Sequence, residues 1–287
     1  MPRLKAIVPA ALIVLVALFV GAPASASQHS DVKANKAMVT FVYDQLFNHA
    51  NVSVIDTFID PIYIQHNPRL VDGPEALRQL IINGRAQNPD SHTTIVRVTA
   101  QRDLVMIHRH SMPQPGALGS SGTDVFRVSK GKIVEHWDVI QPVPATTASG
   151  NDMFATLSKS GDQSTLRTER TALSFYTALT AQHDLRAVDR FVSPSLIQHD
   201  PALTNGSAAV KTAFAARLQA NPQLTFSSLQ VIADQDLISL RYHVQNSPTD
   251  LGQAVNDIYR VGDGKIVEQW SVTQNVPATS ANDNTMF

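Results

Sequence analysis

The chain contains the same sequence twice, and this repeat constrains the fold more than any other feature. Residues 64–68, Ile-Gln-His-Asn-Pro, recur 133 positions later as Ile-Gln-His-Asp-Pro at 197–201. Residues 31–154 align with 164–287 without a gap, and about 40 of the roughly 124 pairs are identical. Unrelated segments of average composition would share about 6%. The chain is therefore a tandem duplication of one domain, with the polar segment 155–163 as a linker.

Each copy has the pattern of an α+β domain, with helices early in the copy and strands after them. In the first copy, apolar side chains recur at helical spacing, and Gly73-Pro74 has the residues that open a helix. Four later runs have strand character and are joined by turns. This order predicts helices packed on one face of a curved antiparallel sheet. The expected helices are 31–49, 52–59 and 74–87, the expected extended segment is 62–66, and the expected strands are about 92–100, 103–112, 122–129 and 132–141.

The first 26 residues have the composition of an export signal. Arg3 and Lys5 precede an apolar run over 6–20, and Ala-Ser-Ala at 24–26 has the small side chains that a signal peptidase requires. The alternative is a membrane anchor, but about 15 residues fall short of the ~20 that span a bilayer. We therefore expect residues 1–26 to be a signal peptide that is removed. The mature chain would be secreted, periplasmic or in the cell envelope, without a membrane partner.

Charge and cysteine content exclude several classes of protein. The chain has 23 Lys and Arg against 24 Asp and Glu, so it has no basic field with which to bind nucleic acid. It has no cysteine, which excludes disulfides, thiolate nucleophiles and Cys-ligated metals. Any chemistry falls to His, Asp, Glu and Trp side chains. We expect no nucleic-acid partner and no resident cofactor.

Several strings of the first copy resemble the SnoaL-like, or polyketide cyclase-like, branch of the nuclear transport factor 2-like superfamily. They are Gln65-His66-Asn67-Pro68, Asp103-Leu104-Val105, and Asp124-Val125-Phe126-Arg127-Val128 running into Gly131-Lys132-Ile133-Val134-Glu135-His136-Trp137-Asp138. The resemblance covers nearly all of 31–154 and, in weaker form, 164–287. It implies two tandem cone-shaped domains, each a strongly curved antiparallel sheet wrapped round N-terminal helices, with a pocket for a small apolar molecule inside.

The resemblance also bears on assembly and activity. Relatives form dimers sheet to sheet, so the two copies are expected to form an intramolecular pseudo-dimer, with a homo-oligomer as a further option. Members of the branch include polyketide cyclases that catalyse aldol ring closure, isomerases, hydrolases and many non-catalytic binders. The resemblance therefore predicts the fold of this chain better than its activity.

Alternation along the last strand of the first copy separates its two faces. Every second side chain, Trp137 among them, is identical in the second copy, whereas His136 and Asp138 become Gln269 and Ser271. We interpret the unchanged face as packed or pocket-lining. This interpretation puts Trp137 in the interior and leaves His136 and Asp138 at solvent or at the surface between the copies.

The candidate catalytic residues of the first copy are Asp124, His108, His110 and His66. Asp124 lies among apolar side chains, where a carboxylate needs a partner that a strand histidine can supply. In relatives a pair of an Asp and a strand His carries the chemistry, and Asp124 with His108 is the matching pair here. Asp124 would be the acid/base that abstracts a proton next to a carbonyl, its pKa raised by an apolar pocket. His66 would donate to a substrate oxygen.

Further residues are expected to contact the substrate or ligand. The second copy keeps an Asp at the position of Asp124 but has Arg241 at that of His108, which weakens the case for a second active site. The expected binding residues are Trp137, Phe126 and Met106 in the first copy, and His199, His243, Asp257, Trp270 and Tyr259 in the second.

Structural roles stay open for these residues. His66 alternatively closes a turn, Asp124 pairs with Arg127 or a buried His, and His108 and His110 are ordinary strand residues. At the level of function, the alternatives to an enzyme of the cyclase or isomerase kind are two. One is a non-catalytic binding or assembly module, and the other is a metal-dependent site built from the same His and Asp side chains. No metal ligand is assigned.

Overall fold

The computed structural model describes residues 26–161 and 163–287. Apart from Ala26, the predicted signal peptide lies outside the described residues. Among those residues, no helix combines the length and the hydropathy that crossing a bilayer requires.

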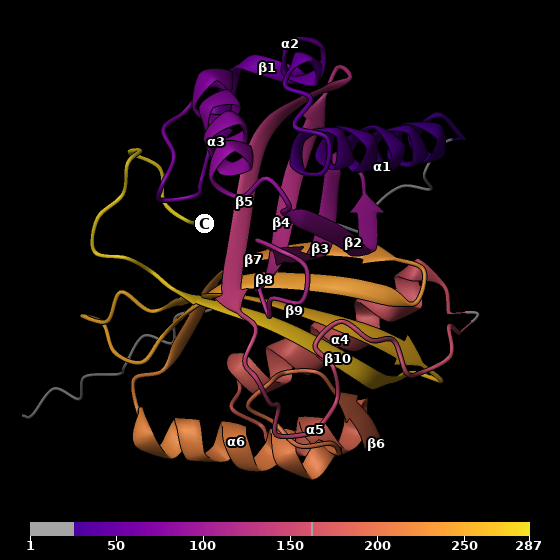
Figure 1. Ribbon diagram of the computed structural model, residues 1–287. Coiled ribbons are helices and arrows are strands. Elements are labelled where there is room, and N and C mark those ends of the chain that lie inside the picture. The colour runs from indigo at the N-terminus through magenta and orange to yellow at the C-terminus, as the bar shows by residue number, and fades with distance from the viewer. Residues whose placement is uncertain (1–25, 162) are drawn as a thin grey trace, which may run out of the picture.

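Within the described residues, each copy folds into three helices and five strands (Figure 1). The α+β architecture is therefore as expected, and the segments found from the sequence match it with differences of a few residues at their ends. The first copy contains α1 (Ala26–Phe47), α2 (Ser53–Phe58), β1 (Ile59–Gln65), α3 (Pro74–Gln87), β2 (His92–Gln101), β3 (Leu104–Met112), β4 (Ser120–Ser129) and β5 (Lys132–Pro142). The second contains α4 (Thr165–Thr180), α5 (Arg186–Phe191), β6 (Val192–Gln198), α6 (Ser207–Ala220), β7 (Thr225–Asp234), β8 (Leu237–Gln245), β9 (Gln253–Gly262) and β10 (Lys265–Asn275).

The strands of the two copies have the same order. The first sheet runs β1-β5-β4-β3-β2 and the second β6-β10-β9-β8-β7. β1 pairs in parallel with β5, and the other neighbours in the first sheet are antiparallel. Gly73 precedes Pro74, the first residue of α3, with a φ of 91°, and Gly206 has a φ of 93° at the same place in the second copy. This conformation is strained for residues with a Cβ, which explains the glycine at both positions.

Helices cover the concave face of each sheet and form the core of each cone with it. In the first copy, Val39 and Val42 of α1 pack with Val105 and Ile107 of β3 and with Phe126 of β4. All five are buried. The sheet therefore presents one face to its own helices, and the space between them becomes the interior of the cone.

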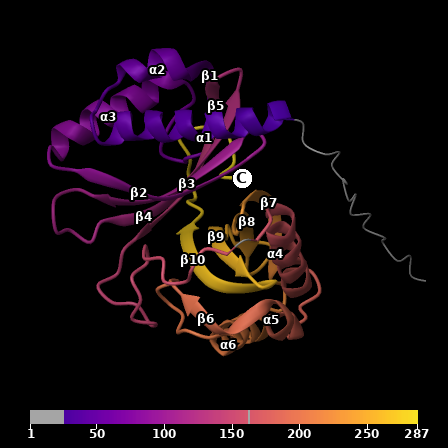
Figure 2. The same ribbon diagram turned by 90° about the vertical axis from the view of Figure 1, so that its right-hand side faces the viewer.

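The opposite faces of the two sheets pack against each other (Figure 2). Six buried apolar side chains meet there, three from each copy. Arg97 of β2 also places its guanidinium 3.8 Å from the ring centroid of Trp270. The two cones thus share one interface, with helices on the outside of both. The six side chains are Met106, Val125, Trp137, Ile232, Ile258 and Trp270.

Candidate functional site

A cavity of about 590 Å³ lies inside the first cone, between the helices and the concave face of the sheet. Most of its wall is apolar, with side chains such as Leu46, Leu77 and Ile81 from the helices. Its polar groups include Arg109, Asp124, His136 and Asp138 from β3, β4 and β5. A cavity of this size, mostly apolar with a few convergent polar groups, suits a small ring compound.

Asp124 is held by positive and neutral donors. Nε of Arg109 donates to its Oδ2 at 2.8 Å, the hydroxyl of Tyr43 donates to the same oxygen at 3.2 Å, and Nε2 of His136 lies 3.1 Å from Oδ1. Burial by itself raises the pKa of this carboxyl, but the charge of Arg109 and the bonds from His136 and Arg109 outweigh it and hold the pKa below its usual value. Asp124 is therefore an ionised, fully engaged carboxylate.

Asp138 is in a different state. Nδ2 of Asn67 donates to its Oδ2 at 2.6 Å, while Oδ1 is buried and has no hydrogen-bond partner in the described part of the chain. Burial raises the pKa of Asp138, and the nearby negative charge of Asp124 contributes to the rise. The first cone thus holds two carboxyls whose environments move their pKa values in opposite directions.

His136 links the two carboxyls to the wall of the cavity. Its Nδ1 lies 2.8 Å from Oε1 of Gln65, and that oxygen is identified as the acceptor because the backbone N–H of Asn67 also donates to it at 2.9 Å. Nε2 faces the carboxylate of Asp124. Both ring nitrogens therefore face acceptors, and the ring also stacks on Phe126 with centroids 4.8 Å apart.

The structure does not bring His108 to Asp124. On the paired strands β3 and β4, His108 lies opposite Thr123 while Asp124 lies opposite Ile107, so the two side chains occupy opposite faces of the sheet. Nε2 of His108 is 3.0 Å from the hydroxyl of Ser121, on the face toward the second copy. Burial, and then the charge of Arg97, hold the pKa of His108 well below its usual value.

His110 and His66 also lie outside the cavity. His110 bonds the carbonyl of Leu118 at 2.8 Å and stacks on Phe154, with ring centroids 4.1 Å apart. His66 is 2.9 Å from Glu135 and stacks on Trp137, with ring centroids 4.7 Å apart. The expected grouping of His66, His110 and Asp124 is therefore not formed, and neither is the alternative metal site made from these histidines.

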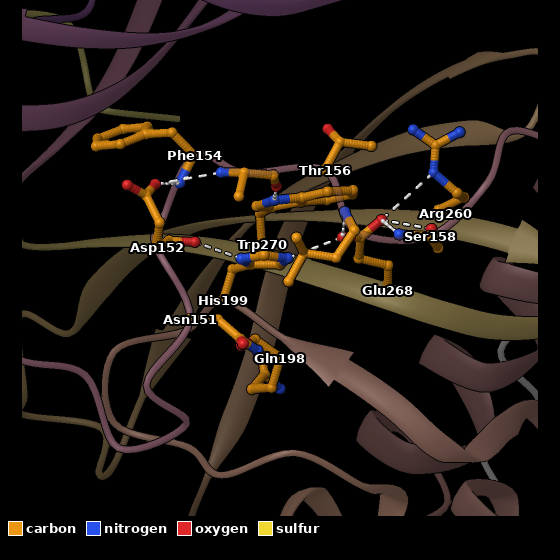
Figure 3. Close-up of polar contacts among 12 residues, drawn as sticks. Asn151, Asp152, Phe154, Thr156, Ser158, Gln198, His199, Arg260, Glu268 and Trp270 are labelled. Atoms are coloured by element: carbon orange, nitrogen blue, oxygen red, sulfur yellow. Dashed lines mark hydrogen bonds and ion pairs between the residues drawn. The ribbon is translucent and has the colours of Figure 1, made fainter.

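The expected binding residues divide in the same way. Phe126 lines the cavity, whereas Met106, Trp137 and Trp270 lie between the two sheets. His199 stacks on Trp270 and lies between the carbonyl of Asp152 and the carboxylate of Glu268, 2.8 Å from the latter (Figure 3). His243 bonds the carbonyl of Leu251 and stacks on Phe287. Asp257 and Tyr259 lie inside the second cone.

The assignment of His136 and Asp138 to the surface is wrong. They are 7% and 4% exposed and line the cavity. The face that is unchanged between the copies is the one on which the two sheets meet, because a pseudo-twofold interface uses the same residues from both sides. A break in register between Ile133 and Glu135 further changes the parity, so Ile133 lies in the core of the cone while Trp137 faces the other copy.

The second cone keeps one carboxylate but not its surroundings. The hydroxyls of Tyr242 and Tyr259 donate to Oδ2 of Asp257 at 2.7 and 2.9 Å, and Nε2 of Gln269 donates to Oδ1 at 3.2 Å. These donors are neutral. At the positions of Arg109, His136 and Asp138 the second copy has Tyr242, Gln269 and Ser271. The charged arrangement of the first cone is thus replaced by hydroxyl and amide groups.

Sequence reasoning missed Arg109, Tyr43, Gln65 and Asn67 as members of the site. Tyr43 and Gln65 are identical in the second copy and carry no signal of their own. Arg109 differs between the copies, as do His136 and Asp138, and that shared divergence was the available signal. The glycine at position 122 is a further signal, because it leaves room for the side chain of Arg109. A Cβ there would lie 2.6 Å from Cζ of Arg109.

One group of the described residues has ligand types close enough to hold a metal ion. Asp124, His136 and Asp138 each offer an atom within 4.8 Å of the others. The guanidinium of Arg109 already binds Asp124, and both nitrogens of His136 face acceptors. A cation would have to displace the guanidinium from Asp124 and break the contacts of the His136 ring nitrogens, so the group fits a hydrogen-bonded ion-pair network better than a metal site.

Comparisons with known proteins agree with this fold. The family model described as SnoaL-like polyketide cyclase matches residues 37–148 and again 170–281. No curated protein matches the chain.

Among solved structures, AclR from Streptomyces galilaeus is 22% identical, covers 39% of this chain and 81% of its own, and has a TM-score of 0.35. IdmH from Streptomyces antibioticus is 18% identical over 37% and 91% of the two chains, with a TM-score of 0.33. TsrD from Streptomyces laurentii is 15% identical over 37% and 88%, with a TM-score of 0.33. Because its family model matches both copies, the chain belongs to the SnoaL-like polyketide cyclase family.

Proposed function

We propose that the first cone binds a small apolar ring compound and catalyses proton abstraction next to a carbonyl, as in aldol cyclisation or isomerisation. The observation that carries the proposal is Asp138. It is a buried carboxyl in the wall of an apolar cavity, with a free oxygen and a pKa raised by burial. A general base works best when its pKa lies near the working pH, which an ordinary Asp does not achieve.

The acid/base role goes to Asp138 in place of Asp124. The carboxylate of Asp124 accepts bonds from Arg109 and Tyr43, and its pKa is lowered, so it is a poor proton acceptor. Its function is to hold Arg109 and His136 in place. Asp138, by contrast, keeps one oxygen, Oδ1, that accepts no hydrogen bond from the described residues.

Arg109 is suited to bind the substrate oxygen. Its Nε and Nη1 donate to Asp124 and to Ser111, while Nη2 has no acceptor among the residues that the structure describes. The group lines the cavity. When Asp138 removes the proton from carbon, the electron pair moves onto the carbonyl oxygen, and a guanidinium N–H stabilises that enolate. In an aldol closure the enolate carbon then attacks a second carbonyl, and the proton on Asp138 returns to the new alkoxide.

The second cone serves as a non-catalytic partner in this proposal. It has Ser271 where the first has Asp138 and Tyr242 where the first has Arg109. These two positions therefore supply neither the base nor the cation there. Burial and the charge of Asp257 raise the pKa of Asp200 in the second cone, but this carboxyl stands at the position of Asn67 and has no cation at the position of Arg109.

We also propose that the protein is exported, because residues 1–26 have the pattern of a signal peptide. N-terminal sequencing of the mature protein from its native cell tests this proposal.

The experiment compares Asp138→Asn with Asp257→Asn, its control in the second cone. An aromatic β-keto ester serves as probe, and NMR in D₂O follows deuterium incorporation at the carbon next to the carbonyl. We expect Asp138→Asn to lose a factor of about 10²–10⁴ in exchange rate, and Asp257→Asn to stay near wild type. Exchange that is unchanged in Asp138→Asn would overturn the proposal. Tight binding of the probe without exchange in the wild type would identify a non-catalytic binder.

A further inference from the structure

Each copy ends in a tail that leaves its own sheet and packs on the other copy. The first tail is residues 143–154 and the second tail is 276–287. In Figure 1 the second tail leaves β10 and ends beside α3 and β5 of the first copy. The exchange is reciprocal, so a loop of each copy is contacted by the tail of its partner.

The second tail binds main-chain carbonyls of the loop 65–72 in the first copy. Nδ2 of Asn282 donates to the carbonyls of Asn67 and Leu70 at 2.9 and 2.7 Å. Nδ2 of Asn284 donates to the carbonyl of Gln65 at 3.1 Å. The N–H of residue 281 donates to the carbonyl of residue 68 at 2.8 Å. Four carbonyls of one short loop are thus held by one tail.

This loop is part of the candidate site. Gln65, Asn67 and Leu70 line the cavity. Asn67 is the residue whose amide donates to Asp138 at 2.6 Å, and Gln65 accepts from His136. Asn284 also donates to Asp72 at 2.8 Å, and Asp72 in turn accepts from the backbone N–H of Gln65 at 2.8 Å. The position of the amide on Asp138 therefore depends on contacts that the second copy provides.

The first tail makes the equivalent contacts with the second copy. Nδ2 of Asn151 donates to the carbonyl of Gln198 at 2.9 Å and to Oδ1 of Asn205 at 2.8 Å, as Asn284 does with Gln65 and Asp72. Figure 3 shows Asn151 beside Gln198. The loop held by Asn151 lies in the cone that has Ser271 in place of the second carboxyl. The same local geometry is thus present twice, with a carboxyl at the position of Asp138 beside only one of the two loops.

We propose that the second tail is a positioning segment of the first copy's site, in which Asn282 and Asn284 fix the loop 65–72 and thereby hold Asn67 on Asp138. The duplication then supplies, within one chain, the partner that holds this loop of the cavity wall. The consequence for the reaction rests on the proposed role of Asp138, whereas the positioning of its carboxyl does not.

The test compares Asn284→Ala with Asn151→Ala, because each removes one bond to a carbonyl and one to a side-chain oxygen. Hydrogen exchange followed by mass spectrometry measures the loops 65–72 and 198–205 in the full-length mature chain. At a net value of about 0.5–1.5 kcal/mol per hydrogen bond, each of the two bonds lost predicts about two- to tenfold faster exchange, in 65–72 for the first variant and in 198–205 for the second.

A second measurement reads Asp138 itself. Carboxyl ¹³C NMR of aspartate-labelled protein follows its titration, with Asp138→Asn assigning the signal. Since the bond from Asn67 lowers the pKa of Asp138, the titration should move to higher pH in Asn284→Ala and stay unchanged in Asn151→Ala. Equal titration of Asp138 in both variants and the wild type overturns the inference.

Two further comparisons keep the test decisive. If Asn284→Ala does not fold, Asn282→Ser replaces it, since this change installs the residue that the first tail has at the equivalent position, Ser149. It removes part of the clamp and should shift the titration in the same direction. A shifted titration together with full turnover in Asp138→Asn would leave the positioning role intact and refute only the proposed reaction.

Discussion

Replacing Arg109 by Leu should destabilise the first copy more than any single change in the second cone. The side chains of Arg109 and Asp124 are 10% and 5% exposed and are joined by a 2.8 Å ion pair. Removing the cation leaves a buried carboxylate with only Tyr43 and His136 as partners. Breaking a buried pair from one side costs about 3–5 kcal/mol, because desolvation of the remaining charge is no longer offset.

Urea denaturation followed by circular dichroism measures the loss in free energy of unfolding. The control is Tyr242→Phe, at the same position of the second copy, which removes one neutral donor to Asp257 while Tyr259 and Gln269 remain. It should cost about 1.5 kcal/mol. Arg109→Leu combined with Asp124→Leu should recover most of the loss, since no unpaired charge is then left in the core.

The pH dependence of the same variant gives an independent check. The folded-state pKa of Asp124 is lowered, so its contribution to stability is present above its unfolded pKa of about 3.9 and is lost as the pH falls through the folded value. Without Arg109 that folded pKa rises toward or above the unfolded value, so the decline in unfolding free energy on the acid side should be shallower than in the wild type. A cost below about 1 kcal/mol in Arg109→Leu, or an unchanged acid limb, would refute the view that this ion pair organises the site.

Two further changes follow from the same network. Gly122→Ala should push the guanidinium of Arg109 aside and cost about 1–3 kcal/mol, because a Cβ would lie 2.6 Å from Cζ, and urea titrations should show the cost disappearing in the Arg109→Leu background. Asp138→Asn should gain stability relative to wild type as the pH rises. Because the pKa of Asp138 is raised, the folded state keeps a proton that the unfolded state has already released. The free energy of unfolding of the wild type therefore falls as the pH rises from the unfolded pKa to the folded pKa, whereas that of Asp138→Asn does not. Equal slopes of unfolding free energy against pH in the two proteins would contradict this.

Much of the fold was accessible from local patterns. Gly73-Pro74 marks the start of α3, and the alternating runs at 92–142 became the four antiparallel strands. These signals are local, since a turn, a helix start and a strand period each depend on residues close in sequence. The repeat added a non-local fact, namely that the two halves share one fold.

The site was harder to predict because the face of a strand that points into a cavity is set by packing between sheets. Asp124 and Phe126 were placed inside the cone correctly, yet His108 and Trp137 belong to the other face. The register break near Ile133 reverses the parity within a single strand, and no sequence pattern marks it. Pairing Asp124 with His108 from their residue types alone therefore joined groups that a sheet separates.

Residues that are identical in two related sequences are usually interpreted as functional, and the duplication reverses this interpretation. When two copies of a domain pack on each other, both contribute the same face to the interface, and a change there must be accommodated from both sides. Trp137 and Trp270 stack on His66 and His199, which in turn contact Glu135 and Glu268, so these six residues are identical in pairs for reasons of packing.

The interior of each cone is under no such mutual constraint. One copy can keep a guanidinium, an imidazole ring and a carboxyl with a raised pKa, while the other has Tyr242, Gln269 and Ser271 at the same three positions. Along β5 from Glu135 to Gln141, the residues that diverge between the copies are the ones on the cavity side, and the identical ones include Trp137 and Val139, which pack against the second copy. The two tails follow this pattern at Asn151 and Asn284, which are the same residue and each hold the other copy's loop.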